Sequence, residues 1–410
     1  MKKKICFLGL GNLGMPCAEK IAEKGHNVKG FDLIKKESKL VKVCDNLDEA
    51  IKDCEFIFIA APTPHNKNYD GRKPILNLPP KDFNYKIVEN ILRKLNKIIK
   101  KNQIIVLIST VLPGTVRRQF IKLIKDKKFI YNPYLIAMGS VGWDMVNPEM
   151  VMIGSKNGEK TPEAKKLINF YKTIMQNKPR YINATWDECE CIKIFYNTFI
   201  SAKISLVNMI QDVAIKQGNI NVDVVTNALA NAKMRITGPQ YMTAGMGDGG
   251  ACHPRDNIAL RYMAKKINLG YDIFHSIMRA REVQAENLAD MLIYFSKKKK
   301  MKIFIHGKAY KPGVEYLDGS YSILIGNYIK KKGIEPIYID PKTGDNVREA
   351  DGVILLAHNS DISYKYAYKI QKKQSMYCKF KKGSIIIDPW RKFKKSKHYT
   401  VIHYGNTRFV

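Results

Sequence analysis

Residues 4–15 read KICFLGLGNLGM, and this stretch decides how the rest of the chain is interpreted. Residues 4–9 are apolar enough for a short buried strand, and residues 13–24 have the apolar spacing of a helix. Between them, Gly9, Gly11 and Gly14 form a GxGxxG motif. Asp32 closes the next expected strand, residues 27–32, about 20 residues further on. A strand, a glycine turn, a helix and a distal acid together predict a dinucleotide-binding fingerprint.

Each part of this fingerprint has a physical role. The glycines allow a tight turn and a close approach of the pyrophosphate, and the helix N-terminus offers free N–H groups to it. Asp32 can accept hydrogen bonds from both ribose hydroxyls and would repel a 2′-phosphate, which favours NAD over NADP. The alternative is a glycine-rich turn without a ligand.

The remaining apolar runs indicate the fold class. Short runs alternate with helical segments up to about residue 185, which is typical of a parallel α/β sheet. Residues 186–296 have mostly helical spacing, and alternation resumes after the lysine run 297–300. We therefore expect two Rossmann-like domains, residues 1–185 binding NAD and residues 297–410 forming a second, smaller α/β domain. Residues 186–296 are expected to form a helical linker and dimerisation segment.

Composition excludes several classes of protein. The chain has 410 residues and a net charge of +33, but its lysines are spread over the whole length, so nucleic-acid binding is not expected. No uninterrupted apolar run reaches the length of a membrane helix, so no membrane partner is expected. The 8 cysteines follow no disulfide or metal-ligand spacing, which indicates reduced cytoplasmic thiols and no metal site.

Residues 245–257, GMGDGGACHPRDN, place a cysteine at the end of a glycine-rich loop. Pro254 fits the first turn of a helix, so Cys252 should lie at the helix N-terminus, where the dipole favours a thiolate. His253 is adjacent, and Asp256 should share a helix face with Cys252. The pattern predicts a reactive thiol, and the alternative is a buried structural cysteine.

These motifs resemble the UDP-glucose/GDP-mannose dehydrogenase family. The cysteine loop is similar to the family signature G-x-G-F-G-G-x-C-F-P-K-D. Five further motifs agree in order and spacing: APTP (61–64), STVLPGT (109–115), ECIKIFYNTFISAKIS (190–205), GKAYKP (307–312) and DPWR (388–391). The resemblance implies oxidation of a primary alcohol on a nucleotide-linked sugar, of the UDP-glucose type, to a uronic acid for surface polysaccharide, with NAD as acceptor.

The resemblance also implies roles for single residues. Cys252 corresponds to the nucleophile, Lys193 and Asn197 to oxyanion and water binding, and Asp256 and Thr110 to proton transfer and water ordering. The resemblance implies that residues 297–410 bind the nucleotide sugar, and the active site is expected between the domains, in a homodimer. The remaining implied cofactor contacts are Gly9, Gly11, Asn12, Leu13, Gly14, Asp32, Pro62, Thr63, Ser109 and Lys311. The implied substrate contacts, beside Lys193 and Asn197, are Tyr134, Arg235, Gly247, Gly249, Gly250, His253 and Arg391.

Several positions depart from the family pattern. Tyr134 and Met138 replace two family glutamates, the first of which assists catalysis, and a tyrosine with a reference pKa of about 10 is a poor base. Asp248 and His253 replace phenylalanines beside the cysteine, and Asp318 replaces an arginine. Three alternatives therefore stay open: another nucleotide sugar, a reaction that stops at the aldehyde, or a catalytically silent nucleotide-binding protein.

Overall fold

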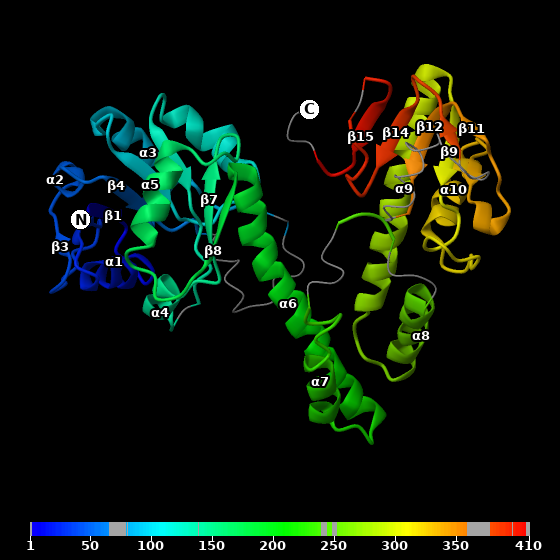
Figure 1. The fold of residues 1–410 in the computed structure, drawn as a ribbon. Helices are drawn as coiled ribbons and strands as arrows, with labels where there is room; N and C mark the ends of the chain where they lie inside the picture. The colour runs from blue at the N-terminus through cyan, green and yellow to red at the C-terminus, as the bar shows by residue number, and fades with distance from the viewer. Residues whose placement is uncertain are drawn as a thin grey trace. The chain divides into compact units, whose positions relative to one another are not determined.

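The computed structural model describes residues 2–64, 79, 81–137, 139–238, 244–247, 252–358, 378–395 and 397–406. Only the backbone is described for Ile204, Asn208, Cys252, His253, Arg255, Asp256 and Ala259. The chain divides into two compact units, unit 1 (Met1–Ile204) and unit 2 (Ser205–Val410). The division falls within the long helix α6 (Trp186–Gln217) (Figure 1). Each unit is described by itself.

Unit 1 is built on an eight-stranded sheet with the order β3-β2-β1-β4-β5-β6-β7-β8. Neighbouring strands are parallel except at β6 and β7, where Tyr131 pairs with Gly154 in antiparallel register. The strands are β1 (Lys4–Leu8), β2 (Asn27–Phe31), β3 (Lys42–Val43), β4 (Phe56–Ile59), β5 (Ile104–Leu107), β6 (Lys128–Tyr131), β7 (Met150–Ser155) and β8 (Arg180–Thr185). The expected parallel α/β sheet is confirmed, with a reversed pair of strands at one edge.

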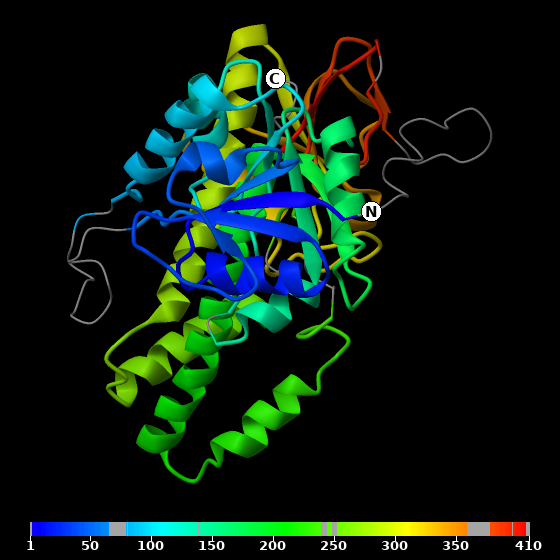
Figure 2. The same cartoon turned by 90° about the vertical axis from the view of Figure 1, so that its left-hand side faces the viewer.

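Two hydrophobic cores lie on the two faces of this sheet. Successive strand side chains point to opposite faces, so Phe7 joins one core and Leu8 the other. The Phe7 core is covered by α1 (Gly14–Glu23), α4 (Val141–Val146) and α5 (Pro162–Tyr171). The Leu8 core is covered by α2 (Leu47–Ile51), α3 (Lys86–Ile98) and the start of α6. Figure 2 shows α1 and α3 on opposite sides of the sheet.

One helical segment of the alternating region is not a regular α-helix. It is a π-helical turn, η2 (Val116–Phe120), followed by a 3-10 turn, η3 (Ile121–Leu123). Neither turn has a side-chain cap of its own, and the amides of Gly114 and Val116 are satisfied by Glu190 of α6. The local geometry is therefore set by a tertiary contact, which helical periodicity does not reveal.

Unit 2 is built on a five-stranded parallel sheet with the order β10-β9-β12-β14-β15. Its strands are β9 (Lys302–His306), β10 (Ile337–Ile339), β12 (Gly352–Leu356), β14 (Ile385–Asp388) and β15 (Thr400–His403), beside a small pair formed by β11 (Glu349–Ala350) and β13 (Lys379–Phe380). Helices α9 (Ile273–Lys299) and α10 (Tyr321–Lys331) cover one face. The unit also contains α7 (Val222–Ala230), α8 (Cys252–Lys266) and the 3-10 turn η4 (Pro341–Thr343). The lysine run ends α9 at Lys299, and Lys300 caps the helix with a left-handed backbone.

Helix α6 bears on the expectation that the chain has no membrane partner. By length and composition alone, its 32 residues are long and apolar enough to span a membrane. This property is not evident from apolar runs in the sequence, because Asn, Thr and Ser interrupt them. The first turn of α6 instead packs Trp186 and Cys189 in the Leu8 core of unit 1, and Met209, near its other end, packs in a core of unit 2 with α8 and α9.

Candidate active site

The first glycine turn lies at the carboxyl end of β1. Gly9 has a φ of +97°, and a Cβ at this position would lie 2.9 Å from the carbonyl oxygen of Ala60. The Gly9 N–H donates to the carbonyl of Phe31 at 2.9 Å. Only glycine fits this left-handed backbone at so close an approach to the end of β4. The turn therefore places the N-terminus of α1 directly above the strand ends.

Asp32 organises the same turn from the end of β2. Its Oδ2 accepts from the Leu10 N–H at 2.6 Å and its Oδ1 from the Ile34 N–H at 3.0 Å. The carboxylate is half-buried and lines a pocket. Asp32 therefore fixes the turn and also faces the space where a ribose would bind.

A pocket of about 590 Å³ lies at these strand ends in unit 1. This volume is within the ~300–1,000 Å³ range of small-molecule and cofactor sites. A Cβ on Gly11 would meet nothing within 4 Å, so this part of the turn stays open to a phosphate. The pocket is lined by Gly9, Gly11, Asn12, Leu13, Asp32, Ile34, Lys36, Ala60, Ala61, Pro62, Thr63, Ile108, Ser109, Thr110, Tyr134, Ile136 and Lys193. The residues present therefore fit a dinucleotide.

The opposite wall of the pocket follows β4 and β5. The Ser109 hydroxyl donates to the Ala61 carbonyl at 2.6 Å, and the Thr63 hydroxyl donates to the Thr110 carbonyl at 2.7 Å. These two bonds tie the APTP and STVLPGT segments together. The structure thus brings the expected residues Pro62, Thr63, Ser109 and Thr110 to the same pocket as the glycine turn.

Lys193 enters the pocket wall from α6. Its side chain is only 9% exposed, and burial lowers the pKa of its amine. Among the described residues, no hydrogen bond or ion pair to this amine is found. Asn197 lies one turn further on and is exposed. A buried amine with a lowered pKa beside a cofactor pocket is typical of functional lysines.

Tyr134 also lines the pocket, but its hydroxyl belongs to a buried hydrogen-bond chain. The Asn132 amide donates to the Met152 carbonyl at 2.6 Å, so the Asn132 oxygen accepts from the Tyr171 hydroxyl. The Tyr134 and Tyr171 hydroxyls are 2.9 Å apart, and because the Tyr171 proton is already donated, Tyr134 is the donor between them. Burial raises the pKa of both tyrosines. Tyr134 is therefore a neutral group that can accept a hydrogen bond.

The cysteine segment belongs to unit 2. Helix α8 begins at Cys252, which confirms the expected position at a helix N-terminus. His253 and Asp256 follow in its first two turns, with Cys252 and Asp256 at positions i and i+4 of this helix. Gly247 has a φ of +94° in the preceding loop, and Arg235 is exposed after α7. Met138, Asp248, Gly249 and Gly250 lie outside the described residues.

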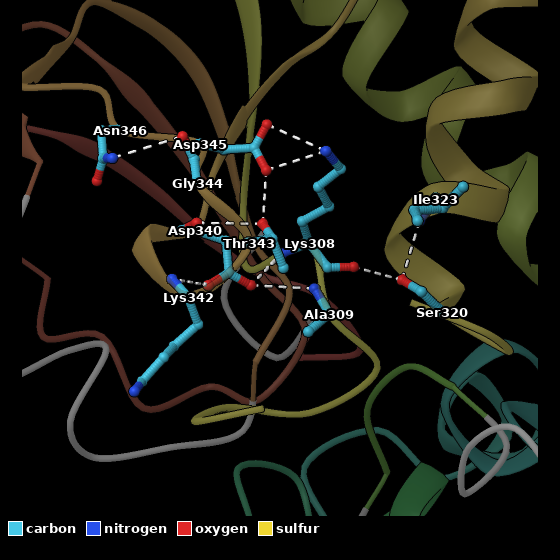
Figure 3. Close-up of polar contacts among 10 residues, drawn as sticks. All are labelled: Lys308, Ala309, Ser320, Ile323, Asp340, Lys342, Thr343, Gly344, Asp345 and Asn346. Carbon is cyan, nitrogen blue, oxygen red and sulfur yellow. Dashed lines mark hydrogen bonds and ion pairs between the residues drawn. The ribbon is translucent and has the colours of Figure 1, made fainter. Parts of the chain in front are cut away.

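The GKAYKP segment leaves the end of β9 in unit 2 and is held by side chains around it (Figure 3). Asp340 Oδ2 accepts from the Lys308 and Ala309 N–H groups at 2.9 and 3.0 Å. Ser320 donates to the Lys308 carbonyl at 2.6 Å. The amine of Lys311, which is exposed, lies 5.3 Å from the ring centre of Tyr310.

Arg391 is the last residue of the DPWR segment. Its guanidinium donates to the backbone carbonyls of Pro389, Tyr404 and Ala244, all within unit 2. The Arg391 side chain, which is expected to contact phosphate, therefore also holds the loop before α8 through Ala244.

The sequence did not single out several residues that build the site. Lys36, Ile108 and Ile136 line the pocket, Asn132 and Tyr171 orient Tyr134, and Glu190 ties α6 to the STVLPGT segment. Position 36 carries one visible signal, a lysine pair just after Asp32. Glu190 begins the ECIKIFYNTFISAKIS motif, but nothing in that motif indicates its contact, and the remaining residues lie in apolar or helical runs without a motif of their own.

The glycine turn, Asp32 and the pocket at the switch between β1 and β4 define a dinucleotide-binding protein of the Rossmann type. The family model for the NAD-binding domain of the UDP-glucose/GDP-mannose dehydrogenases matches residues 31–175, and the model for their central domain matches residues 187–282. The chain belongs to the UDP-glucose/GDP-mannose dehydrogenase family, whose members are NAD-dependent nucleotide-sugar dehydrogenases, and its cofactor is NAD.

Individual relatives agree with this assignment at low identity. The chain is 24% identical over 410 residues to a UDP-glucose 6-dehydrogenase of Rickettsia prowazekii, covering 95% of this chain and 90% of the relative. It is 25% identical to the UDP-glucose 6-dehydrogenase of Pongo abelii, covering 96% and 85%. A crystal structure of a ternary complex of GDP-mannose dehydrogenase from Pseudomonas aeruginosa matches with a TM-score of 0.78 and 21% identity, covering 97% and 99%. That likeness supports the fold.

Proposed function

We propose that this chain oxidises the 6-hydroxyl of a UDP-hexose of the glucose type to a carboxylate, in two NAD-dependent steps. The observation that carries the proposal is the buried amine of Lys193 in the wall of the NAD pocket. A protein that only binds NAD gains nothing from burying an unpaired amine there, because burial of a charged group is costly. An amine that stabilises developing negative charge gains strength from the same burial.

The chemistry balances with the residues of this chain. Two NAD molecules, bound one after the other, would each accept one hydride, one for each oxidation. In the first, the alcohol proton passes through water to Asp256, and an aldehyde forms. The Cys252 thiolate then attacks the aldehyde carbon, and Lys193 and Asn197 bind the resulting oxyanion. Loss of the second hydride converts this adduct into a thioester. Water ordered by Thr110 hydrolyses it, which releases the acid and restores the thiol.

The position of Cys252 supports its role as the nucleophile. It is the first residue of α8, a helix of 15 residues, and the dipole at a helix N-terminus stabilises a thiolate. We expect Cys252→Ala to abolish carboxylate formation. The control is Cys191→Ala, which changes a half-buried thiol on α6 that does not line the pocket. Unchanged carboxylate yield from Cys252→Ala, measured by mass spectrometry of the sugar product, refutes the assignment.

The substrate is tested by a panel of UDP-, GDP- and dTDP-sugars, with NADH absorbance as the readout. The curated relatives above act on UDP-glucose, which supports UDP-glucose as the first candidate. The departures at Asp248, His253 and Asp318 favour screening other sugars in the same panel. NAD binding without NADH production from any sugar would favour the silent nucleotide-binding protein instead.

A second candidate function is release of the aldehyde. It is favoured by Tyr134, whose proton is donated to Tyr171, so that it can orient water but cannot take its proton. NADH counted per sugar consumed separates the two functions: a ratio of two indicates the acid and a ratio of one the aldehyde. If the aldehyde accumulates, we expect Tyr134→Glu to raise the ratio, with Tyr134→Phe as the matched control.

We further propose that the protein acts in the cytoplasm as a homodimer and supplies a uronic acid for surface polysaccharide. The apolar surface of α6 supports self-association, since Phe195 and Phe199 are 54% and 58% exposed in the single chain. Sedimentation equilibrium tests this. A monomer at enzyme concentrations used for assay contradicts the homodimer.

A further inference from the structure

Glu190 is a fully buried carboxylate that the proposed chemistry does not use. It is 0% exposed and lies three residues before Lys193 in the first turns of α6. Its Oε2 accepts from the Gly114 N–H, and its Oε1 accepts from the Val116 N–H at 2.8 Å. Each oxygen thus binds one backbone amide of the segment that leads from the pocket into η2.

That segment is anchored at three separate places. Near the pocket, Ser109 donates to Ala61 and the Thr110 carbonyl accepts from Thr63. In the middle, the Leu112 N–H donates to the hydroxyl of Tyr85 at 3.2 Å, and Tyr85 is the residue before α3. At the far end, Gly114 and Val116 bind Glu190. Of these three attachments, the one to Glu190 reaches the helix that carries Lys193.

A second contact joins the same elements at the surface. Arg117 of η2 forms a two-pronged ion pair with Asp187 of α6, with N–O distances of 2.8 to 3.1 Å. The Arg117 side chain is 60% exposed and that of Asp187 is 31% exposed. An exposed ion pair contributes little, so it is a natural comparison for the buried carboxylate.

Burying a carboxylate is unfavourable. Desolvation raises the pKa of Glu190 to about 7, although its two backbone hydrogen bonds lower it. An apolar side chain would fill the same space at less cost, but it would leave two buried amides without acceptors. The carboxylate at this position therefore has a geometric purpose that an apolar residue cannot serve.

We propose that Glu190 is a positioning residue, which sets the distance between the Ser109–Thr110 wall of the NAD pocket and Lys193. One carboxylate binds the backbone of one wall, and the helix that carries it presents Lys193 one turn later on the other wall. The effect on NAD affinity needs only the pocket itself. The effect on turnover rests on the proposed function, through Lys193.

The test compares Glu190→Gln, Glu190→Ala and the control Asp187→Asn in the full chain. Gln keeps one acceptor and Ala keeps none, so we expect NAD affinity to fall about tenfold in Glu190→Ala and less in Glu190→Gln, because a buried amide loses its acceptor. With a sugar that is turned over, kcat should fall in the same order while the sugar KM changes less than twofold. Asp187→Asn should stay within twofold of the unmodified protein in all three quantities.

The outcomes separate this inference from the proposed function. If Glu190→Ala lowers thermal stability but leaves NAD affinity and kcat unchanged, Glu190 is structural and the inference is overturned. If no sugar is oxidised, the proposed function fails while NAD affinity, measured by calorimetry, still tests Glu190. If the variants do not fold, hydrogen exchange of the unmodified protein decides: slow exchange in the peptide covering residues 114–120 supports the contact, and fast exchange overturns it.

Discussion

The sheets of units 1 and 2 use the same device at the end of their first strands. After β1, Gly9 has a φ of +97° and its N–H donates to Phe31, the last residue of β2. After β9, Gly307 has a φ of +103° and its N–H donates to Ile339, the last residue of β10, at 2.8 Å. In both units the residue just after that neighbouring strand is an aspartate, Asp32 or Asp340. Its carboxylate accepts hydrogen bonds from backbone N–H groups of the turn.

The two aspartates differ in what covers them. Asp32 is half-buried and lines the NAD pocket. Asp340 is 6% exposed and lies in a polar cluster with Thr343, Asp345 and Lys308 (Figure 3). Three amides bind Asp340, those of Lys308, Ala309 and Lys342. Its carboxylate is thus committed to the protein.

The space beside the glycine also differs. In unit 1 the neighbour of Gly9 is the small backbone turn at Ala60. In unit 2 the imidazole of His358 lies where a Cβ on Gly307 would be only 2.6 Å away, and its Nε2 is 2.8 Å from the Ala309 carbonyl. The same backbone frame is therefore open to a ligand in one unit and filled by a side chain in the other. Topology locates a possible site, and side chains decide whether it is open.

The largest expected effect comes from replacing each of the two aspartates with alanine. Asp340→Ala leaves the buried amide of Ala309 and the less buried amides of Lys308 and Lys342 without their acceptor, so we expect the free energy of unfolding to fall by about 3 kcal/mol. Asp32→Ala should cost less stability, but it should weaken NAD binding at least about tenfold through the lost ribose contact. Denaturant unfolding and NAD titration of both variants check this. Equal losses in both measurements would break the comparison.

The second prediction concerns pH, because burial shifts the pKa values of Glu190 in unit 1 and His306 in unit 2 in opposite directions. Burial raises the pKa of Glu190 to about 7 from 4.5, so its contribution to stability is present below pH 4.5 and is lost as pH rises through 7. Burial lowers the pKa of His306 to about 4 from 6.5, so its contribution is present above pH 6.5 and is lost as pH falls through 4. Each change amounts to at most about 3 kcal/mol.

Between pH 4.5 and 6.5 the two units should therefore respond in opposite directions. Hydrogen exchange of the full chain is measured at pH 5 and 6.5 and corrected for the intrinsic exchange rate. As pH rises, the amides of unit 1 should become less protected and those of unit 2 more protected. Glu190→Gln should remove the trend in unit 1 and leave that in unit 2. A parallel response of both units contradicts the assignment of these pKa shifts to separate sheets.

The smallest expected effect compares two ion pairs. Lys308 and Asp345 are 24% and 23% exposed and lie 3.0 Å apart, and the Lys308 amine also lies 5.3 Å from the ring centre of Tyr338. Arg117 and Asp187 are more exposed. We expect Lys308→Met to cost about 1 kcal/mol and Arg117→Met about 0.5 kcal/mol or less. Chemical denaturation in low and high salt checks both, since only the exposed pair should lose its effect at high salt.

Local patterns predicted much of the frame of unit 1. The glycine turn, the strand that precedes it and Asp32 belong to one β-α-β segment, so their fixed spacing carries the information. The start of α8 at Cys252 followed from Pro254 in the same way. The antiparallel β7 and the strand β8 at the edge of the sheet were not predicted, because their apolar runs do not show strand direction.

The parts of the site that the sequence did not reveal depend on contacts across the fold. Glu190 lies 74 residues from Val116, and Tyr134 lies 37 residues from Tyr171. Single residues at such separations carry no periodic or spacing signal, although both pairs determine how the pocket is built.

The sequence alone determined the family, the NAD turn and the position of a cysteine at the start of a helix, because these depend on backbone conformation within short segments. Only the tertiary structure decided that Asp32 is open while Asp340 is closed, and that Lys193 lies in the wall of the NAD pocket. Burial and hydrogen bonding are properties of neighbours in space, and the chain brings those neighbours together only when it folds.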